Sequence, residues 1–422
     1  MPPPLELPTI QNWSCHNCGG CCRQHAIEIT ADERERILSQ HWEADPNISR
    51  DRPFLVKIGP YPWSKRYRLG HQPDGACVFL DDRGLCRIHA KFGERAKPLA
   101  CRIYPYAFHP AGKKITVSLR FSCPSVAGNR GRSLAEQRDD LKALERLVVP
   151  EGAEQIPPPE ISPGQSLDWN ETLKIVDRLE SQIAEGEGGA VTGLVRAIKF
   201  VELIGQSRFQ KIRGDRLDEF LEIVSAAADG DTGTDLGTIS EPSPVGRMQF
   251  RLLCAQYARR DTFADRESGW RNRWRLFRAV LRFTRGTGLI PPLQTEFSPV
   301  PFADLERPFG PLPEGVDDML IRYLRVKLRG LHFCGRAYYN VPLVEGFQSL
   351  ALVVPVVLWL ARWLAAGRGR GHLELDDVLR ALNIADHHHG YSPAFGQSGF
   401  RGRVRLLART DDISKLAAWY GR

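Results

Sequence analysis

The spacing of apolar residues predicts helices throughout the second part of the chain. From about residue 166 onward, apolar positions recur every three or four residues, a period that places them on one face of an α-helix. Passages rich in Gly and Pro at 229–244 and 291–313 interrupt the pattern. The predicted helices are residues 167–184, 190–205, 215–228, 247–260, 266–286, 316–331, 342–366, 373–382 and 411–419.

The first 128 residues follow a mixed pattern. Thr30 and Glu33 have the spacing of a capping box, which predicts a helix over 31–40. Two short apolar runs flank an Asp-Asp-Arg-Gly turn within 77–89, which predicts a hairpin. Apolar and polar residues alternate over 114–123, which predicts a strand.

These patterns together predict a mainly α protein. A small α+β cysteine-rich metal-cluster domain covers 11–128, a helix and a proline-rich linker cover 129–165, and a larger all-α domain covers 166–422. A chain of 422 residues exceeds a single ordinary core, so more than one domain is expected.

One apolar run invites comparison with a membrane span. Residues 350–361 are almost all apolar, but a span needs about 20 such residues, and Pro355 and Arg362 break the run. We predict a buried core helix there and no membrane span. The first ten residues lack the basic and apolar segments of a secretory signal, which favours a cytoplasmic location in which thiols stay reduced.

The cysteines are the most informative chemistry in the chain. Eight of the ten lie in the first 123 residues, and thiolates are ligands that zinc and iron prefer. We expect these sulfurs to converge on a shared inorganic centre; buried free thiols and disulfides are the less favoured alternatives. The predicted metal-binding residues are Cys15, Cys18, Cys21, Cys22, Cys77, Cys86, Cys101 and Cys123.

The spacing leaves the metal open between zinc and an iron–sulfur cluster. Adjacent residues such as Cys21 and Cys22 rarely both bind one ion, so a multinuclear site or one ligand with a supporting thiol is expected. The pair tilts the interpretation toward a cluster of the [4Fe–4S] kind. Cys86 and His89 could add a thiolate–imidazole pair, and the arginines that directly follow cysteines could offset thiolate charge. These arginines are Arg23, Arg87 and Arg102.

Other features carry weaker signals. The net charge of +8 fits a genome that favours arginine better than it fits a nucleic-acid partner. Trp270, Trp274, Phe277 and Leu281 recur at helical spacing among arginines, and we interpret them as core with a solvated rim. The run 387–389 of three histidines is predicted to be a loop without a metal. Residues 338–340 could line a substrate pocket or pack in the core.

The cysteine motifs carry a family resemblance. CHNCGGCC at 15–22, GACVFL at 75–80, GLCRIH at 84–89, KPLACRIYP at 97–105 and SCP at 122–124 together resemble the YkgJ-type cysteine-cluster family of zinc- or iron-chelating proteins. The whole layout resembles the longer branch of that family, the flagellin lysine-N-methylases. In that comparison IRYLR at 321–325 and the following apolar helix are similar to the C-terminal part.

The resemblance implies an enzyme that methylates lysine ε-amino groups of a flagellin-like protein substrate with S-adenosylmethionine. It names no catalytic residue and no oligomeric state here, and the sequence contains no Gly-x-Gly-x-x-Gly after a predicted strand that would mark a familiar methyl-donor site. Two alternatives stay open. One is a non-catalytic zinc or iron module with a helical interaction domain, and the other, less favoured, is a nucleic-acid binder.

Overall fold

The computed structural model describes residues 3–48, 52–59, 63, 65–185, 188–231, 236–259 and 270–422. Its strands are β1 (Leu5–Glu6), β2 (Glu28–Ile29), β3 (Leu55–Ile58), β4 (Arg66–Leu69), β5 (Tyr106–Ala111) and β6 (Lys114–Leu119). Its N-terminal helices are α1 (Gly20–Gln24), α2 (Ala31–Leu38), α3 (Arg87–Phe92), α4 (Leu99–Ile103), α5 (Pro124–Ala127) and α6 (Arg138–Val148). The later helices are α7 (Trp169–Ala184), α8 (Gly189–Gln206), α9 (Asp215–Asp231), α10 (Pro244–Ala258), α12 (Trp270–Arg285), α13 (Phe302–Leu305), α14 (Val316–Arg329), α15 (Leu343–Ala351), α16 (Val353–Gly367), α17 (Leu375–His388), α18 (Ser398–Arg409) and α19 (Asp412–Tyr420).

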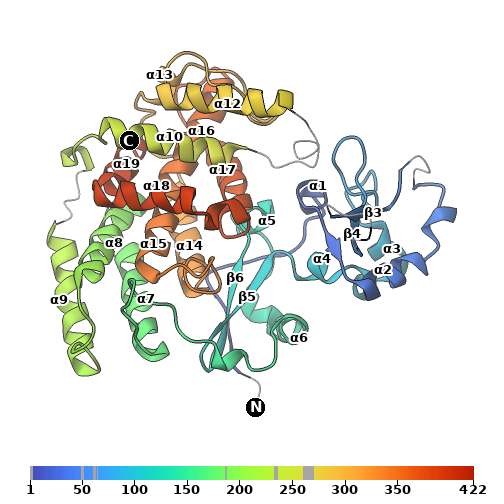
Figure 1. Ribbon diagram of the computed structural model, residues 1–422, viewed down its shortest axis with the longest axis horizontal. Helices are drawn as coiled ribbons and strands as arrows, with labels where there is room; N and C mark the ends of the chain where they lie inside the picture. The colour runs from blue at the N-terminus through green and yellow to red at the C-terminus, as the bar shows by residue number, and fades with distance from the viewer. Residues whose placement is uncertain are drawn as a thin grey trace.

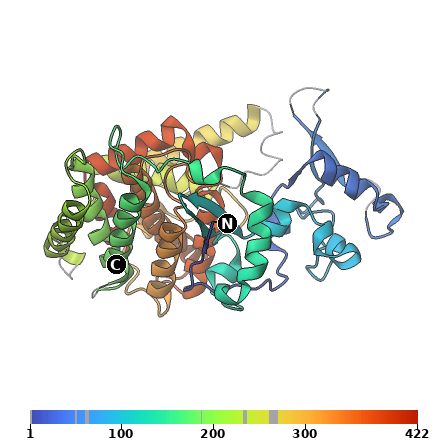
Figure 2. The ribbon, with the colours of Figure 1, turned by 90° about the horizontal axis from the view of Figure 1, so that it is seen from below.

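A large helical body and a smaller N-terminal unit make up the molecule (Figures 1 and 2). The unit contains β2–β4 and α1–α4 and projects from one side of the body, while β5 and β6 lie between them in the view of Figure 1. The chain is therefore mainly α, with its small sheets near the N-terminus, as the sequence predicts.

Each of the two sheets has three strands. In the first, β6 is central and pairs antiparallel with β5 and parallel with β1, with Tyr106 opposite Leu119 at one end of the hairpin and Ala111 opposite Lys114 at the other. In the second, β4 is central between β2 and β3. The predicted strand over 114–123 is confirmed as β6, although it ends at Leu119.

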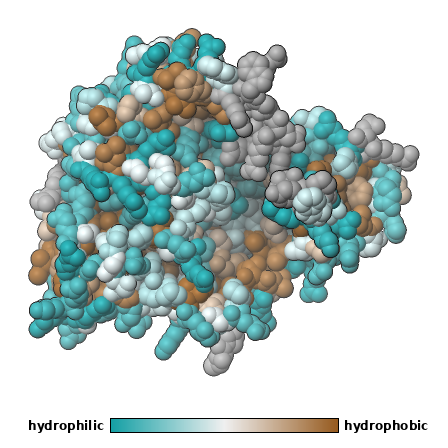
Figure 3. All heavy atoms as spheres, viewed as in Figure 1, coloured by the Kyte–Doolittle hydropathy of each residue, from teal (hydrophilic) through white to brown (hydrophobic). Residues whose placement is uncertain are grey.

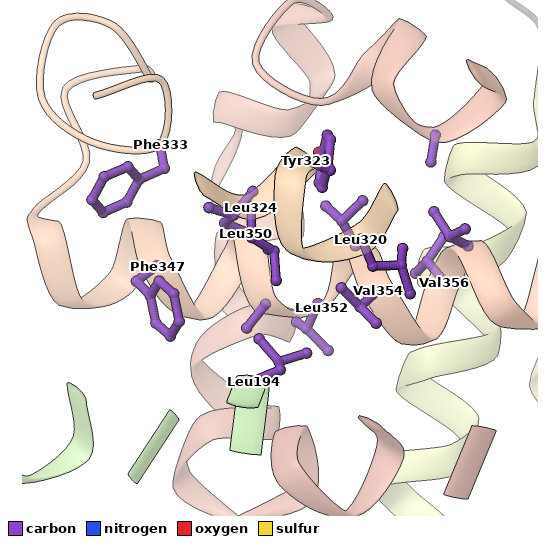
Figure 4. Close-up of a cluster of buried hydrophobic side chains, with 14 of the residues drawn as sticks. Leu194, Leu320, Tyr323, Leu324, Phe333, Phe347, Leu350, Leu352, Val354 and Val356 are labelled. Atoms are coloured by element: carbon purple, nitrogen blue, oxygen red, sulfur yellow. The ribbon is translucent and has the colours of Figure 1, made fainter. Parts of the chain in front are cut away.

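Buried apolar side chains form two clusters. The larger joins β1, β5, β6 and α5 to the helices of the body (part of it is drawn in Figure 4), and the smaller lies in the N-terminal unit around Ile37, Trp42 and Phe79. The proline-rich segment 149–165 packs on the body, because Ile161 is fully buried and the backbone N–H of Leu343 donates to the Glu160 carbonyl at 2.8 Å. The predicted domain boundaries do not coincide with the two clusters, and they stay a prediction.

Local sequence accounts for several helix starts. Thr30 and Glu33 form the predicted capping box at the start of α2, and Asp168 caps α7 by accepting from the Glu171 N–H at 2.9 Å. The predicted helix over 342–366 is divided into α15 and α16 at Leu352. Pro355 explains the break, since it has no N–H to donate to the preceding turn.

The apolar segment of this helix pair is a core element. Leu343–Gly367 is long and apolar enough to cross a membrane, but 89% of its most apolar window is buried inside the protein. All side chains of α16 from Val353 to Ala365 are buried, including Arg362, which donates to the backbone carbonyls of Leu305 and Tyr420 at 3.0 Å each. The prediction of a buried core helix is confirmed.

Four local predictions need correction. In 77–89, only Leu80 and Cys86 pair as a bridge, because the chain turns into α3 at Arg87. His387 and His388 belong to the last turn of α17 rather than to a loop. The sequence analysis missed α18, whose glycines and arginines obscure its apolar face.

The aromatic stripe on α12 lies on the surface and does not form the predicted core. Trp274 is 58% exposed and Phe277 is 52% exposed, and apolar atoms gather on this part of the surface in Figure 3. Phe283 of α12 has no exposed area and enters the core, and Ala279 on the same helix is also buried. The stripe is thus a surface feature; the Trp270 side chain lies outside the described part of the chain.

Candidate metal centre and the adjoining polar cluster

The cysteine-rich loop turns sharply into α1. Asn17 and Gly19 have φ values of 54° and 65°. A second glycine lets this loop pack on the turn at 81–84, because a Cβ on Gly84 would lie 2.4 Å from the Asn17 carbonyl oxygen. Cys15 and Cys18 stay exposed on the loop.

Five of the eight predicted ligands gather at one end of the N-terminal unit. Cys22 and Cys86 pack against the apolar cluster that contains Cys77, and the Cys21 sulfur lies beside that of Cys22. The charges of Cys77, Cys86 and Cys21 act on Cys101. Cys21 and Cys22 come from α1, and Cys77 is the bridge partner of His71. Cys86 directly precedes α3, and Cys101 lies in α4. The Cys77 N–H donates to the Cys22 carbonyl at 2.8 Å, which fixes the second element on the first. We call these residues the thiol cluster: Cys21, Cys22, Cys77, Cys86 and Cys101.

Cys21 and Cys22 form the closest pair of the cluster, with their sulfurs 4.0 Å apart. The contact between the two sulfurs, in which either thiol can donate, lowers the pKa of Cys21 to about 6, helped by the charge of Lys97, whereas the same contact and burial raise the pKa of Cys22. Two ligands of a tetrahedral metal with bonds of about 2.3 Å would be about 3.8 Å apart, so this spacing suits a common metal.

The remaining predicted ligands are Cys15, Cys18 and Cys123. Cys123 caps α5 and is buried, and the charge of Cys18 contributes to raising its pKa after burial. Within the thiol cluster, burial raises the pKa of Cys77 to about 12 and also raises the pKa of Cys101. In the part of the chain that the structure describes, no three His, Cys, Asp or Glu side chains are placed to share one metal ion, so the expected convergence of all eight sulfurs is not seen.

The donor chemistry of the thiol cluster nevertheless fits zinc or iron. All of its members are free thiols, which are the ligands of structural zinc sites and of iron–sulfur clusters. Cys254 and Cys334 are buried in the helical body, away from this group. Which thiols bind a metal stays a prediction.

The charged residues around the thiols differ from those expected. Lys97 is the cation whose charge acts on Cys21, whereas Arg23 pairs with Asp74 at 2.8 Å on the surface. His89 is exposed on α3 and takes no place in the thiol cluster. The sequence analysis missed Lys97 because it considered only arginines that directly follow a cysteine.

A group of aromatic, histidine and arginine side chains adjoins the thiols where the N-terminal unit meets the body. The ring centroid of His25 lies 5.0 Å from that of Tyr104 and 5.0 Å from that of His387. The ring centroid of Tyr391 lies 4.8 Å from that of His332. The Arg120 guanidinium connects the two sets, 3.5 Å from the centroid of Tyr391 and 5.7 Å from that of Tyr104. We call this the polar cluster: His25, Tyr104, Arg120, His332, His387 and Tyr391.

The polar cluster and the candidate ligands occupy the same short elements. His25 is three residues after Cys22, Tyr104 is three residues after Cys101, and Arg120 is three residues before Cys123. The negative charges of Cys123 and Cys21 contribute, after burial, to raising the pKa of Tyr104. The charges of the candidate ligands therefore reach the polar cluster.

Four histidines of this region, His25, His109, His332 and His389, are held neutral. Burial, and then the charge of Arg120, lower the pKa of His25 to about 3. Burial and the charge of Lys327 lower the pKa of His332 well below its usual value, and those of His109 and His389 to about 4 and about 3. Neutral imidazoles can donate and accept hydrogen bonds but add no charge.

A buried ion pair locks the end of β6 to the helical body. Lys327 Nζ and Asp386 Oδ1 are 2.7 Å apart, and neither side chain has exposed area. Asp386 Oδ2 also accepts from the backbone N–H groups of Phe121 at 2.5 Å and Ser122 at 3.2 Å. The segment between Arg120 and Cys123 is therefore held by α14 and α17.

Most of these residues escaped the sequence analysis. The histidine run and residues 338–340 carry a visible pattern, but no motif links Arg120 or Lys327 to them, because Arg120 lies more than two hundred residues before Tyr391 and Lys327 lies 59 residues before Asp386. Tyr338 is a core residue that hydrogen-bonds Ser349 at 2.7 Å, and Asn340 borders a cavity of about 490 Å³. That cavity is also lined by the proline-rich segment, including Pro157, Pro158 and Pro159.

The family match covers the N-terminal part of the chain, which contains the eight candidate ligands. Residues 14–124 match a family model described as "Putative zinc- or iron-chelating domain". A lysine-N-methylase of Salmonella choleraesuis is 26% identical over 145 residues, and one of Salmonella typhimurium is 25% identical over 145 residues, each match covering 33% of this chain and 34% of the relative. The flagellar biosynthetic protein FliU of Salmonella muenchen is 27% identical over 122 residues, which is 28% of this chain and 70% of that protein.

These matches reach only part of each molecule. The chain aligns with about a third of the length of the two lysine-N-methylases, and no solved structure matches it. The predicted resemblance is confirmed: the chain contains a cysteine domain of the zinc- or iron-chelating family and is similar over about a third of its length to lysine-N-methylases.

Proposed function

We propose that this protein is a metal-dependent protein lysine N-methylase that takes its methyl group from S-adenosylmethionine. The proposal rests on one juxtaposition: a thiol cluster suited to zinc or iron lies beside a buried polar cluster, in a chain similar to proteins named lysine-N-methylase. The proposal places the protein in the cytoplasm, where its thiols stay reduced, and makes a flagellin-like protein its substrate.

In this scheme the thiol cluster holds the metal, with Cys18 and Cys123 as supporting thiols. A bound zinc or iron–sulfur centre would supply a Lewis acid or redox-active group next to the polar cluster. Cys22 and Cys77 are central among the candidate ligands, because the contact between their backbones joins α1 to the loop before α3. The eight free thiols provide enough sulfur for a multinuclear centre, which keeps a [4Fe–4S] cluster among the candidates.

The polar cluster suits a lysine nucleophile, which must be neutral to attack a methyl group. Burial, with the charge of Arg120 contributing, lowers the pKa of the chain's own Lys327 even though Asp386 opposes the shift. Burial of a substrate ammonium in this region would favour its neutral form in the same way. The proposal names no base for its proton, because burial lowers the pKa of His25 to about 3 and makes that imidazole a poor proton acceptor at neutral pH.

Methyl transfer to flagellin tests the proposal. Protein purified without oxygen is incubated with S-adenosylmethionine and flagellin, and lysine methylation is read by mass spectrometry. We expect methylated lysines with the wild type and with Cys254→Ser, and none with Cys22→Ser, whose sulfur lies in the thiol cluster. Tightly held metal with no methyl transfer to flagellin or to other lysine-rich proteins would instead support a non-catalytic metal module.

A further inference from the structure

Arg120 is the cation of the polar cluster, near the rings of Tyr391 and Tyr104 and close enough to His25 and His332 for its charge to act on them. β6 ends at Leu119, and the Arg120 N–H donates to the Pro105 carbonyl at 2.8 Å, which fixes the backbone. Its guanidinium lies against the Tyr391 ring, with the Tyr104 ring farther away. Stacking on aromatic rings orients the plane of a guanidinium while leaving its N–H groups free to bind an anion.

No carboxylate neutralises Arg120 among the residues that the structure describes. Its Nε is inaccessible to solvent and has no hydrogen-bond partner there. Asp386 is the carboxylate whose pKa responds to Arg120, but it is already paired with Lys327 and accepts two backbone N–H groups. A partly buried guanidinium without such a partner is costly, so this position favours an incoming anion.

The surface gives access to this position. The exposure of Arg120 is intermediate, so the side chain is not sealed inside the protein. Figure 3 shows the surface hollowed at the junction between the body, where α5 and α17 end, and the N-terminal unit, where α1 and α4 lie. His25 follows α1 and Tyr104 follows α4, so the polar cluster is built at this junction.

We propose that Arg120 binds the carboxylate of a small ligand that sits between the thiol cluster and the polar cluster. Resting on the proposed function, this ligand is the methyl donor and the group is the carboxylate of its methionyl end. The paired N–H groups of Arg120 form a fork that matches a carboxylate, and Tyr391 holds that fork in place.

Calorimetric titration of the full chain, purified without oxygen, tests this assignment. The ligands are S-adenosylhomocysteine, which has the carboxylate, and methylthioadenosine, which lacks the whole amino-acid end. The variants are Arg120→Gln, Arg120→Lys, and Arg23→Gln as a matched control, since Arg23 is an exposed arginine beside the cysteines that already pairs with Asp74. Metal content and circular dichroism are measured on each.

We expect Arg120→Gln to bind S-adenosylhomocysteine about 10- to 100-fold more weakly than the wild type and methylthioadenosine equally well. Arg120→Lys keeps the charge without the fork, so its loss should be smaller, and it serves as the test if Arg120→Gln does not fold. Arg23→Gln should bind both ligands as the wild type does.

Two failures are distinguishable. If Arg120→Gln binds S-adenosylhomocysteine as tightly as Arg23→Gln does, the role of Arg120 is overturned and the proposed function stands. Where Arg120→Gln does not fold, the same result with Arg120→Lys overturns it. If the wild type binds neither ligand, the methyl donor of the proposed function is overturned together with this inference.

Discussion

Lys327 of α14 and Asp386 of α17 form an ion pair of 2.7 Å that is fully removed from solvent. The pair does more than join two helices, because Lys327 also donates to the Leu119 carbonyl at 3.0 Å and Asp386 accepts from the N–H groups of Phe121 and Ser122. It therefore sets the position of the turn that carries Arg120 and Cys123. The helical body thereby determines the geometry of a segment in the cysteine domain.

Removing one partner of this pair should be strongly destabilising. Asp386→Asn leaves the Lys327 ammonium buried without its counter-charge, and we expect a loss of about 3–5 kcal/mol in the free energy of unfolding. The matched control is Asp376→Asn, an exposed carboxylate on the same helix. Urea unfolding followed by circular dichroism measures both, and equal stability of the two variants would contradict the role of the pair.

Replacing both partners together separates charge from packing. The double variant Lys327→Met with Asp386→Leu removes both buried charges, so it should lose less stability than Asp386→Asn alone. It also removes the acceptor for the Phe121 and Ser122 N–H groups. We therefore expect it to fold but to bind metal less well than the wild type.

The buried histidines predict that stability falls in acid. Burial lowers the pKa of His389 to about 3, so the folded protein stays unprotonated there while the unfolded chain takes up a proton below its usual pKa near 6.5. The unfolded state then binds more protons, and stability must decrease as the pH falls through the window between the two values. Each such histidine contributes a slope of about 1.4 kcal/mol per pH unit within that window.

His389→Asn isolates one of these histidines. The Asn amide can keep the contact that His389 Nδ1 makes with the Tyr257 hydroxyl at 2.9 Å, but it cannot titrate. Urea unfolding between pH 4 and 6.5 should show a shallower decline for the variant than for the wild type, by about one proton. Identical slopes would mean that His389 is charged in the folded protein.

The exposed stripe on α12 should matter little for stability. We expect Trp274→Ala to change the free energy of unfolding by less than about 0.5 kcal/mol, since Trp274 is mostly exposed. Phe283→Ala on the same helix should cost about 3–5 kcal/mol, since Phe283 is fully buried against Phe302 and Trp363. If both variants were equally destabilised, the stripe would be core, as its spacing first indicated.

The sequence predicts elements whose causes are local. The periodicity of α7 and α8, the capping box of α2 and the alternation in β6 each lie within a few residues, so these elements appear where expected. The aromatic stripe of α12 was misjudged because an amphipathic pattern indicates an apolar face without indicating what covers it.

The candidate site was only partly predictable for the same reason. The cysteine motifs identify the thiols and their family, since their spacing is local and specific. Arg120, Lys327 and Asp386 carry no such motif, and only the packing of α14 and α17 on the end of β6 brings them together. His387 was visible as part of a histidine run, but its helix and its neighbour His25 were not.

Metal content measured on anaerobically purified protein tests the account most directly. Elemental analysis and an absorption spectrum are compared for the wild type, for Cys22→Ser in the thiol cluster and for Cys254→Ser in the helical body. We predict bound zinc, or iron with the brown colour of an iron–sulfur cluster, in the wild type and in Cys254→Ser, and its loss in Cys22→Ser. A wild type without either metal, or a Cys22→Ser variant that retains the full amount, would contradict the claim that these N-terminal thiols form a metal centre.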